Sequence, residues 1–315
     1  MTSSSATTAS SGPPAERPLY AIGLRLGAVV ALSMMWALVK LLGTRDVHLV
    51  ELLFYRQAFA VPVVYAWIVW TTGPRGIATN RLDLHVTRTF VGLTSMAFNF
   101  GAVMLLPLAE STTIGFSAPI FATIFSALIL REATGIHRWI AVLVGFAGVV
   151  VMARPDAGHF PLFGLVIAII AAVGVATISI ILRSMARSET PSAIVFWFTL
   201  LSVPPLGLLM LWFGQGHDPV TWALILAMGV CGGIAQLLLT NALKWARVVI
   251  VMPMDYSAIV WAALLGWLFW GTLPIASTWL GAGLIVASGL YIVLREHRLG
   301  RIATLRAQAD AEMRE

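Results

Sequence analysis

Ten long apolar segments run through this sequence of 315 residues. A transmembrane helix needs about 20 consecutive, mostly apolar residues, because it must cross about 30 Å of hydrocarbon. Residues 162–182 are apolar on every face, whereas the strands of a membrane β-barrel alternate apolar with polar residues. Since 59% of the residues are hydrophobic and only 11% are charged, a water-soluble fold is excluded. The sequence predicts an all-α integral membrane protein with ten transmembrane helices.

The ten predicted segments form two sets of five. The first set lies at residues 20–42, 50–71, 89–106, 111–130 and 139–153, and the second at 162–182, 192–213, 220–243, 248–270 and 277–294. The segment at 139–153 is short, so it is either an incomplete span or extends into its flanks. Residues 1–18 are rich in Ser, Thr, Ala and Pro and predict a disordered cytoplasmic tail, and residues 296–315 predict a basic cytoplasmic tail.

The positions of the basic residues explain the net charge of +6. With the N-terminus inside, sixteen of the 20 Lys and Arg residues fall on the cytoplasmic side, Arg25 and Arg88 among them. Three fall on the opposite side, and Arg56 lies within a segment. Because basic loops mark the cytoplasmic side, we expect a multi-pass protein of the cytoplasmic (inner) membrane with both termini in the cytoplasm. Its partner is then the lipid bilayer, and the charge requires no nucleic acid.

Residues that would indicate an intramembrane enzyme are missing from the predicted spans. The single cysteine, Cys231, cannot form a disulfide or a zinc site within the chain. All six histidines lie in predicted loops or at segment ends, and the sequence has no HExxH motif. We therefore expect no catalysis, no metal and no cofactor. A channel is disfavoured as well, because channel filters are usually assembled from several subunits.

The two halves of the chain, residues 20–153 and 160–295, resemble each other. Setting Ala109 against Ala246 aligns residues 106–110 with 243–247 and places Asn99 opposite Gln236. Because each repeat holds five spans, the second must enter the membrane from the opposite side. Inverted repeats of this kind are typical of secondary transporters, whose substrate site lies near the midplane between the halves. A purely structural duplication is the alternative.

Several stretches resemble the EamA type of the drug/metabolite transporter superfamily. They are residues 106–121, which begin Leu-Pro-Leu-Ala-Glu, residues 139–148 in the fifth segment, and residues 255–257 and 261–267 in the ninth. The resemblance covers about residues 20–295 and implies two inverted repeats that work by alternating access. Family members commonly carry Leu-Gly-Glu after the fourth and ninth segments. This chain has Leu-Arg-Glu at 130–132 and Trp-Gly-Thr at 270–272, so the second glutamate is missing.

The resemblance indicates transport and leaves the substrate open. The superfamily includes exporters of amino acids and drugs and importers of nucleotide-like metabolites. Our first expectation is therefore a transporter of small organic metabolites, exporting amino acids or related compounds. The alternative is an uptake carrier for a nucleotide-like or vitamin-like solute, of the S-adenosylmethionine or riboflavin type. A membrane scaffold or receptor is a weaker possibility.

Arg56 and Asp255 are the charged residues predicted to lie well inside the membrane. An intramembrane charge is costly and is a functional candidate by default. Arg56 is expected to contact an anionic substrate group, to cap helix-end carbonyls, or to pair loosely with Glu51. Asp255 is expected to bind coupling protons, to attract a cationic substrate, or to cap a helix broken at Pro253. Pro119 and Pro253 predict discontinuous helices that face a cavity and serve in gating.

Neutral side chains complete the predicted cavity. The amides Asn99, Gln236 and Asn241 either bond a polar substrate or hold helices together. Ser117 and Tyr256 stand beside the proline breaks, and the deep tryptophans Trp36 and Trp197 are candidates for stacking on a planar substrate.

Glycines in the fifth and tenth segments predict close helix packing. They are Gly145, Gly148, Gly281 and Gly283. The sequence is compatible with a monomer or a homodimer.

Overall fold

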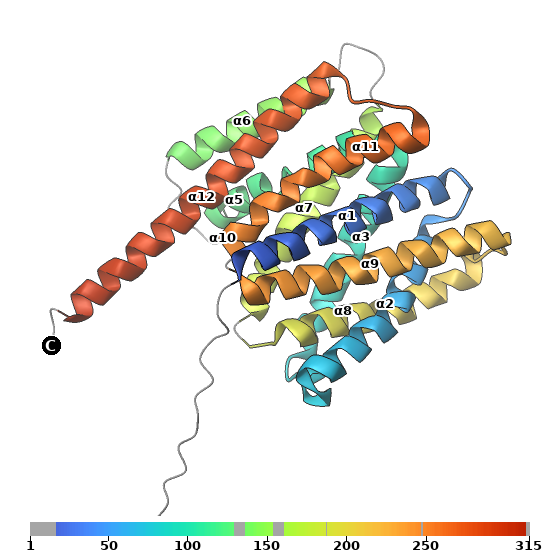
Figure 1. The fold of residues 1–315 in the computed structure, drawn as a ribbon, viewed down its shortest axis with the longest axis horizontal. Helices are drawn as coiled ribbons and strands as arrows, with labels where there is room; N and C mark the ends of the chain where they lie inside the picture. Colours follow the sequence, from blue (N-terminus) through green and yellow to red (C-terminus); the bar gives the residue numbers. More distant parts are fainter. Residues whose placement is uncertain (1–16, 129–135, 154–160, 187, 247, 313–315) are drawn as a thin grey trace, which may run out of the picture.

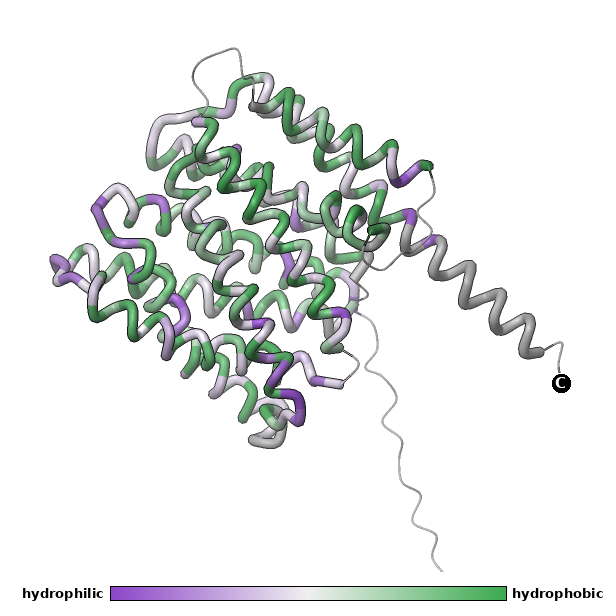
Figure 2. Tube along the Cα trace, turned by 180° about the vertical axis from the view of Figure 1, so that it is seen from behind, coloured by the Kyte–Doolittle hydropathy of each residue, from purple (hydrophilic) through white to green (hydrophobic). Residues whose placement is uncertain are grey.

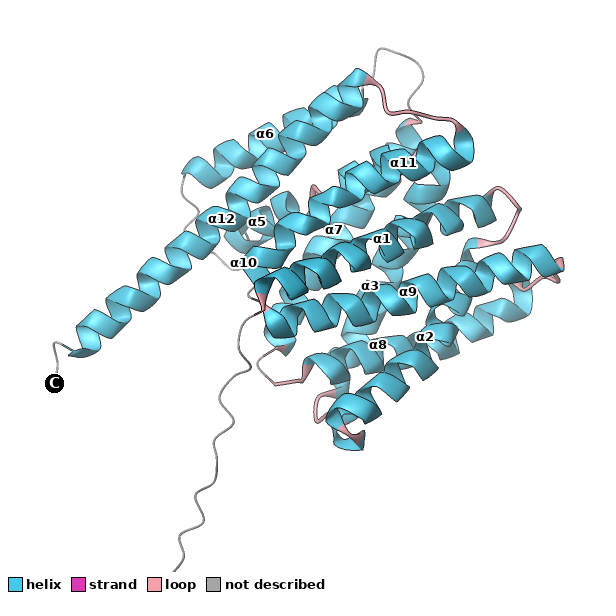
Figure 3. Cartoon of the chain, in the orientation of Figure 1, coloured by secondary structure: helices cyan, strands magenta, loops and turns pink. Residues whose placement is uncertain are grey.

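All regular secondary structure in the described chain is helical. The computed structural model describes residues 17–128, 136–153, 161–186, 188–246 and 248–312, and within these ranges no strand occurs (Figure 3). The predicted all-α fold class is confirmed. The predicted N-terminal tail and the Leu-Arg-Glu motif at 130–132 lie, almost entirely, outside the described residues.

The helices fall into two sets. The first comprises α1 (Pro18–Gly43), α2 (Leu49–Thr72), the 3-10 helix η1 (Pro74–Ile77), α3 (Leu82–Leu105), α4 (Leu108–Gly115), α5 (Ala118–Leu128) and α6 (Ile136–Ala153). The second comprises α7 (Leu162–Met185), α8 (Pro191–Phe213), α9 (Pro219–Trp245), α10 (Val248–Val251), the 3-10 helix η3 (Met252–Ser257), α11 (Ala258–Trp270) and α12 (Ala276–Glu312). Counting α4–α5 and α10–η3–α11 as one broken segment each, the described chain has ten membrane segments.

Most of these helices are long and apolar enough to cross a bilayer. Eight such spans occur in the described residues, and α6 is a shorter apolar helix of 18 residues. The helix α3 is as long as its neighbours, but its first two turns carry Asp83, His85 and Arg88, which makes it less apolar. Figure 2 shows hydrophobic residues along most of each helix and hydrophilic ones mainly at helix ends. The chain is a multi-pass membrane protein.

Several helix boundaries differ from the predicted ones. The largest difference at a helix start is in α3, which begins at Leu82, seven residues before the predicted start at residue 89. Helix α6 begins at Ile136, three residues before the predicted start of the fifth span, so this segment extends into its flank. Helix α12 does not end at the predicted residue 294 but continues to Glu312, and it extends beyond the bundle (Figure 1).

The contacts between helices follow a two-fold pattern. Helix α1 packs on α9, and the corresponding helices of the other repeats, α7 and α3, pack on each other. Replacing each helix by its counterpart in the other repeat likewise turns the α2–α9 contact into the α8–α3 contact. Pairs α2–α8 and α6–α12 each join a helix to its own counterpart. Exchanging the repeats therefore relates the strongest contacts to one another, as expected for two copies related by a pseudo-two-fold axis.

The two membrane segments that contain Pro119 and Pro253 are each interrupted. Helix α4 ends at Gly115 and α5 begins at Ala118, with Pro119 in its first turn. The Ser117 hydroxyl donates to the Ile114 carbonyl across this break. In the other repeat Pro253 lies in the 3-10 helix between α10 and α11. Proline lacks a backbone N–H, so a continuous α-helical ladder cannot pass through it.

Helices α6 and α12 approach each other closely at glycines. A Cβ on Gly281 would lie 2.5 Å from the Gly148 carbonyl oxygen, and a Cβ on Gly148 would lie 2.8 Å from the Gly281 oxygen. Gly145 is packed as closely, against Ile120. The prediction for Gly283 is wrong, because nothing lies within 4 Å of a Cβ there. Gly283 is on the side of α12 that faces away from these neighbours.

We predict that Gly281→Ala lowers the stability of the purified protein by about 1–3 kcal/mol, because the methyl group overpacks against the α6 backbone. Thermal unfolding in detergent, followed by tryptophan fluorescence, measures the change. Gly283→Ala on the same helix is the matched control and should leave the midpoint unchanged or raise it, since alanine favours helix. Equal effects of the two substitutions would contradict the observed packing.

Candidate functional site

A cavity of about 250 Å³ lies where the two repeats meet. It is bordered by helices α2, α3, α7, α8 and α9, and its lining residues are Arg56, Gln57, Ala60, Val64, Arg88, Leu182, Ile194, Val195, Phe198, Thr199, Gly232 and Gln236. Two predicted site residues, Arg56 and Gln236, are brought together here from different repeats. The cavity is therefore formed between the halves, where an inverted-repeat transporter binds its substrate.

Arg56 reaches the cavity from about two turns inside α2. Its Nη1 donates to Gln57 Oε1 at 2.8 Å and lies 3.0 Å from Met96 Sδ. Its Nε is buried and has no hydrogen-bond partner. The alternative partner Glu51 is not used, because that carboxylate bonds to His217 and to the backbone of Gln215. Arg56 therefore retains an unused donor beside the cavity.

Arg88 is a second arginine in the cavity, and the sequence analysis placed it in a cytoplasmic loop. Helix α3 begins at Leu82, so Arg88 lies almost two turns inside the helix. Its guanidinium stacks on Phe198 with 4.0 Å between the guanidinium carbon and the ring centroid. Gly92, one turn further along α3, leaves space for this stacked guanidinium. A Cβ at position 92 would clash with Arg88 Nη1 and with the Phe198 ring. An arginine followed four residues later by glycine was the local signal for this position.

The cavity holds donors in excess of acceptors. Nε of Arg56, Nε and Nη1 of Arg88, and Nε2 of Gln57 are buried atoms without a hydrogen-bond partner. Neither arginine has a salt bridge to any carboxylate in the described residues. Buried donors are costly to leave unpaired, and two neighbouring guanidinium groups repel each other. An anionic group entering the cavity would relieve both costs, since guanidinium groups bind carboxylates through paired N–H donors.

Asp255 is paired with Arg25, which the sequence analysis also placed in a loop. Helix α1 begins at Pro18, so Arg25 lies two turns inside it. The Arg25 Nε donates to Asp255 Oδ1 at 2.6 Å and Nη2 to Oδ2 at 2.5 Å. Residues 230 positions apart therefore join α1 of the first repeat to η3 of the second. The expectation that Arg56 and Asp255 alone carry charge deep in the helices is wrong.

The other predicted site residues lie away from this cavity. Asn99 and Asn241 donate to carbonyls one turn back in their own helices. Trp36 packs edge-on against Phe100, and Trp197 Nε1 donates to the Ile77 carbonyl at 2.9 Å. Tyr256 contacts the Phe116 ring, with 4.9 Å between centroids.

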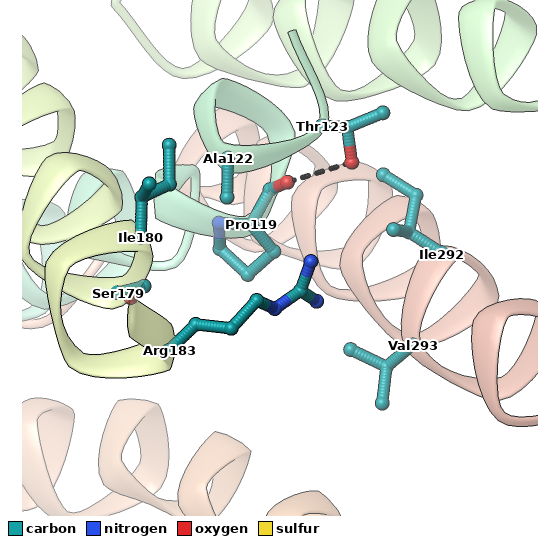
Figure 4. A pocket seen from close by; sticks show the side chains of 8 residues that line it. All are labelled: Pro119, Ala122, Thr123, Ser179, Ile180, Arg183, Ile292 and Val293. Carbon is teal, nitrogen blue, oxygen red and sulfur yellow. Dashed lines mark hydrogen bonds between the residues drawn. The ribbon is translucent and has the colours of Figure 1, made fainter. Parts of the chain in front are cut away.

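Pro119 lines a smaller pocket of about 120 Å³. Figure 4 shows the Arg183 side chain crossing this pocket from α7 toward Ile292 and Val293 of α12. The Thr123 hydroxyl donates to the Pro119 carbonyl on the opposite wall. Its other lining residues are mostly aliphatic, so this pocket offers fewer polar groups than the Arg56–Arg88 cavity.

The fold defines a multi-pass membrane protein with a cavity between two repeats. The sequence profile of the EamA-like transporter family matches residues 19–154 and 162–294. The chain belongs to this family of transporters, and it is related to transport proteins rather than to enzymes.

Relatives with known roles move different solutes. The chain is 29% identical to a riboflavin transporter of Vibrio cholerae, over 78% of this chain and 83% of the relative. It is 30% identical to the pseudopaline exporter CntI of Pseudomonas aeruginosa, over 81% and 89%. It is 27% identical to an S-adenosylmethionine uptake transporter of Rickettsia prowazekii, over 82% and 87%. One solved crystal structure shares the fold with a TM-score of 0.60 at 23% identity, over 89% of this chain and 98% of its own.

We predict that Arg25 and Asp255 are energetically coupled. Removing either partner leaves a largely buried charge unpaired, so Arg25→Ala and Asp255→Ala should each destabilise the protein by about 2 kcal/mol. The double variant should lose clearly less stability than the sum of the losses in the two single variants. A double-mutant cycle by unfolding in mixed detergent micelles measures this coupling.

The matched control for that cycle is the exposed pair Arg81–Asp83, whose side chains are 51% and 65% exposed. Water screens this pair, so its cycle should show no measurable coupling. Additive losses for Arg25 and Asp255 would show that their contact does not hold α1 to η3.

Proposed function

We propose that this chain is a secondary transporter that moves a small organic metabolite bearing a carboxylate, an amino acid or a related compound, across the cytoplasmic membrane. The substrate carboxylate binds Arg56 and Arg88, and the two repeats expose the cavity to each side of the membrane in turn. Export is the proposed direction. The observation that carries this proposal is the pair of arginines, three of whose buried nitrogen atoms, Arg56 Nε and Arg88 Nε and Nη1, have no hydrogen-bond partner in the described residues.

The chemistry of the cavity supports an anionic substrate group. A guanidinium presents a planar set of donors that matches a carboxylate, and the attraction is strong where water is excluded. The amides of Gln57 and Gln236 are placed to bond other polar atoms of the solute. Phe198 supplies an apolar wall.

The size of the cavity supports a small solute. Sites for drug-sized ligands usually enclose about 300–1,000 Å³, whereas this cavity encloses about 250 Å³. The volume favours an amino-acid-sized compound over a nucleotide-like one. The alternative, uptake of a vitamin-like or nucleotide-like solute, is supported by the riboflavin and S-adenosylmethionine relatives. The exporter relative supports the proposed direction.

The distribution of basic residues supports cytoplasmic termini. Arg25 and Arg88 no longer count as residues at a segment end, because each lies about two turns beyond the start of its helix. Fourteen Lys and Arg residues then remain on the proposed cytoplasmic side, against three on the other. The positive-inside rule gives the same orientation with either count.

A binding screen followed by flux measurement tests the proposed substrate class. Purified protein is titrated with amino acids, nucleosides and vitamins, and the ligands found are tested for flux into proteoliposomes. We expect a carboxylate-bearing ligand, with affinity lowered at least about tenfold by Arg56→Gln or Arg88→Gln, since each removes a charge-assisted hydrogen bond.

Two alanine substitutions in α3 provide a matched pair for this assay. Gly92→Ala should weaken binding to a similar extent by displacing the Arg88 guanidinium from Phe198. Gly101→Ala places its Cβ in ordinary contact, 3.5 Å from Ile167, and should bind as the native protein does. Unchanged affinity in both arginine variants would contradict the proposed site.

We also infer that protons drive the transport, with Asp255 as the group that binds them. Protonation would release Arg25 from its bidentate pair and so uncouple α1 from η3. We predict that Asp255→Asn abolishes or flattens the pH dependence of flux in proteoliposomes. Asp83→Asn, at an exposed acid, is the control. An unchanged pH profile in Asp255→Asn would rule out this role.

A further inference from the structure

Helices α2 and α8, which lie on either side of the pseudo-two-fold axis, run antiparallel. His48, at the start of α2, stacks on Phe213 at the end of α8, with 4.3 Å between ring centroids. Just past the other end of α2, the Ile77 carbonyl accepts from Trp197 near the start of α8. Since α2 has 24 residues, the two ends are about 36 Å apart.

One end of this helix pair is joined by a buried histidine–glutamate contact. Glu51, in the first turn of α2, is fully buried, and both of its carboxylate oxygens lie 3.1 Å from His217 Nε2. The same carboxylate accepts from the Gln215 backbone N–H at 2.7 Å. His217 and Gln215 belong to the α8–α9 connection of the second repeat. Next to His217, Asp218 caps α9, and hydrogen bonds from the Thr221 hydroxyl and backbone hold the pKa of Asp218 below its usual value.

The opposite end carries a second contact of the same kind. His85, in the first turn of α3, and Glu189, in the α7–α8 connection, are both buried. Glu189 Oε2 lies 3.3 Å from His85 Nε2, at ion-pair distance but without hydrogen-bond geometry. Its Oε1 accepts from the Thr79 hydroxyl at 2.9 Å. First and second repeats are therefore joined at this end too.

The two contacts are equivalents under exchange of the repeats. Each glutamate lies at the start of the second membrane helix of its repeat, Glu51 in α2 and Glu189 just before α8. Each histidine lies at the start of the third, His85 in α3 and His217 just before α9. Each glutamate pairs with the histidine of the other repeat. The pseudo-two-fold axis thus relates the contact at one end of the bundle to the contact at the other.

The Arg56–Arg88 cavity lies between these two contacts. Glu51 is five residues before Arg56 in α2, and His85 is three residues before Arg88 in α3. Separating the repeats at either end would therefore open the cavity from that end.

We propose that Glu51–His217 and Glu189–His85 are the two gates of the transporter, each closing the cavity on one side of the membrane. This inference rests on the proposed alternating-access function and is independent of which solute is carried. Opening on one side breaks the pair on that side, while the other pair holds the repeats together. Because the pairs are symmetry equivalents, opening on either side separates a glutamate of one repeat from a histidine of the other.

Labelling of a cavity thiol from each side tests the two gates without any substrate. The background is Cys231→Ser with Ala60→Cys, because Ala60 lines the cavity. A membrane-impermeant maleimide is added to intact cells or to inverted membrane vesicles. We expect His217→Ala to raise the labelling rate roughly tenfold on one side of the membrane, and His85→Ala to raise it by a similar factor on the other.

A conservative variant separates gating from a merely structural role. His217→Gln retains an N–H donor for the Glu51 carboxylate and should label close to the background rate, whereas a general loosening of the fold would raise labelling from both sides. Labelling that rises on the same side in both alanine variants, or in neither, would overturn the proposal. If each histidine variant is labelled from a different side while the Arg56 and Arg88 variants transport normally, the result would support the two gates and contradict the proposed substrate site.

Discussion

The cost of burying a charge away from water governs this structure. Most charged groups within the helices meet that cost with a partner: Arg25 binds both oxygens of Asp255, and Lys40 donates to the Leu106 carbonyl at 2.6 Å, at the end of α3. Arg56 and Arg88 are different, because several of their donors are buried and unpaired beside a cavity. A ligand that supplies hydrogen-bond acceptors for these donors would therefore stabilise the protein.

The inverted repeat determines where these groups meet. The strongest contacts between the halves join residues far apart in the chain, and exchange of the repeats relates α1–α9 to α3–α7 and α2–α9 to α3–α8. The cavity draws on α2 and α3 from one repeat and α7, α8 and α9 from the other. The histidine–glutamate pairs at the two ends of α2 and α8 follow the same symmetry. A movement that opens one end therefore has a counterpart of similar energy at the other.

Long apolar runs were sufficient to predict the helical class and the ten segments, and the prolines predicted the breaks near Pro119 and Pro253, because these features depend on local sequence. The site was predicted in part. Arg56 and Gln236 do line the cavity, but Arg88 was assigned to a loop because the apolar run begins only at Thr89, whereas the helix begins at Leu82. The pairing of Arg25 with Asp255 joins residues 230 positions apart. No local pattern in the sequence encodes such a contact.

Calorimetric titration of the purified protein with a carboxylate ligand, and with the methyl ester of the same compound, measures whether the arginine pair binds the carboxylate of the transported solute. We expect the ester to bind at least about tenfold more weakly to the native protein, and this difference to disappear in the Arg56→Gln/Arg88→Gln double variant. Equal affinity of the acid and the ester for the native protein would contradict this role of the arginine pair.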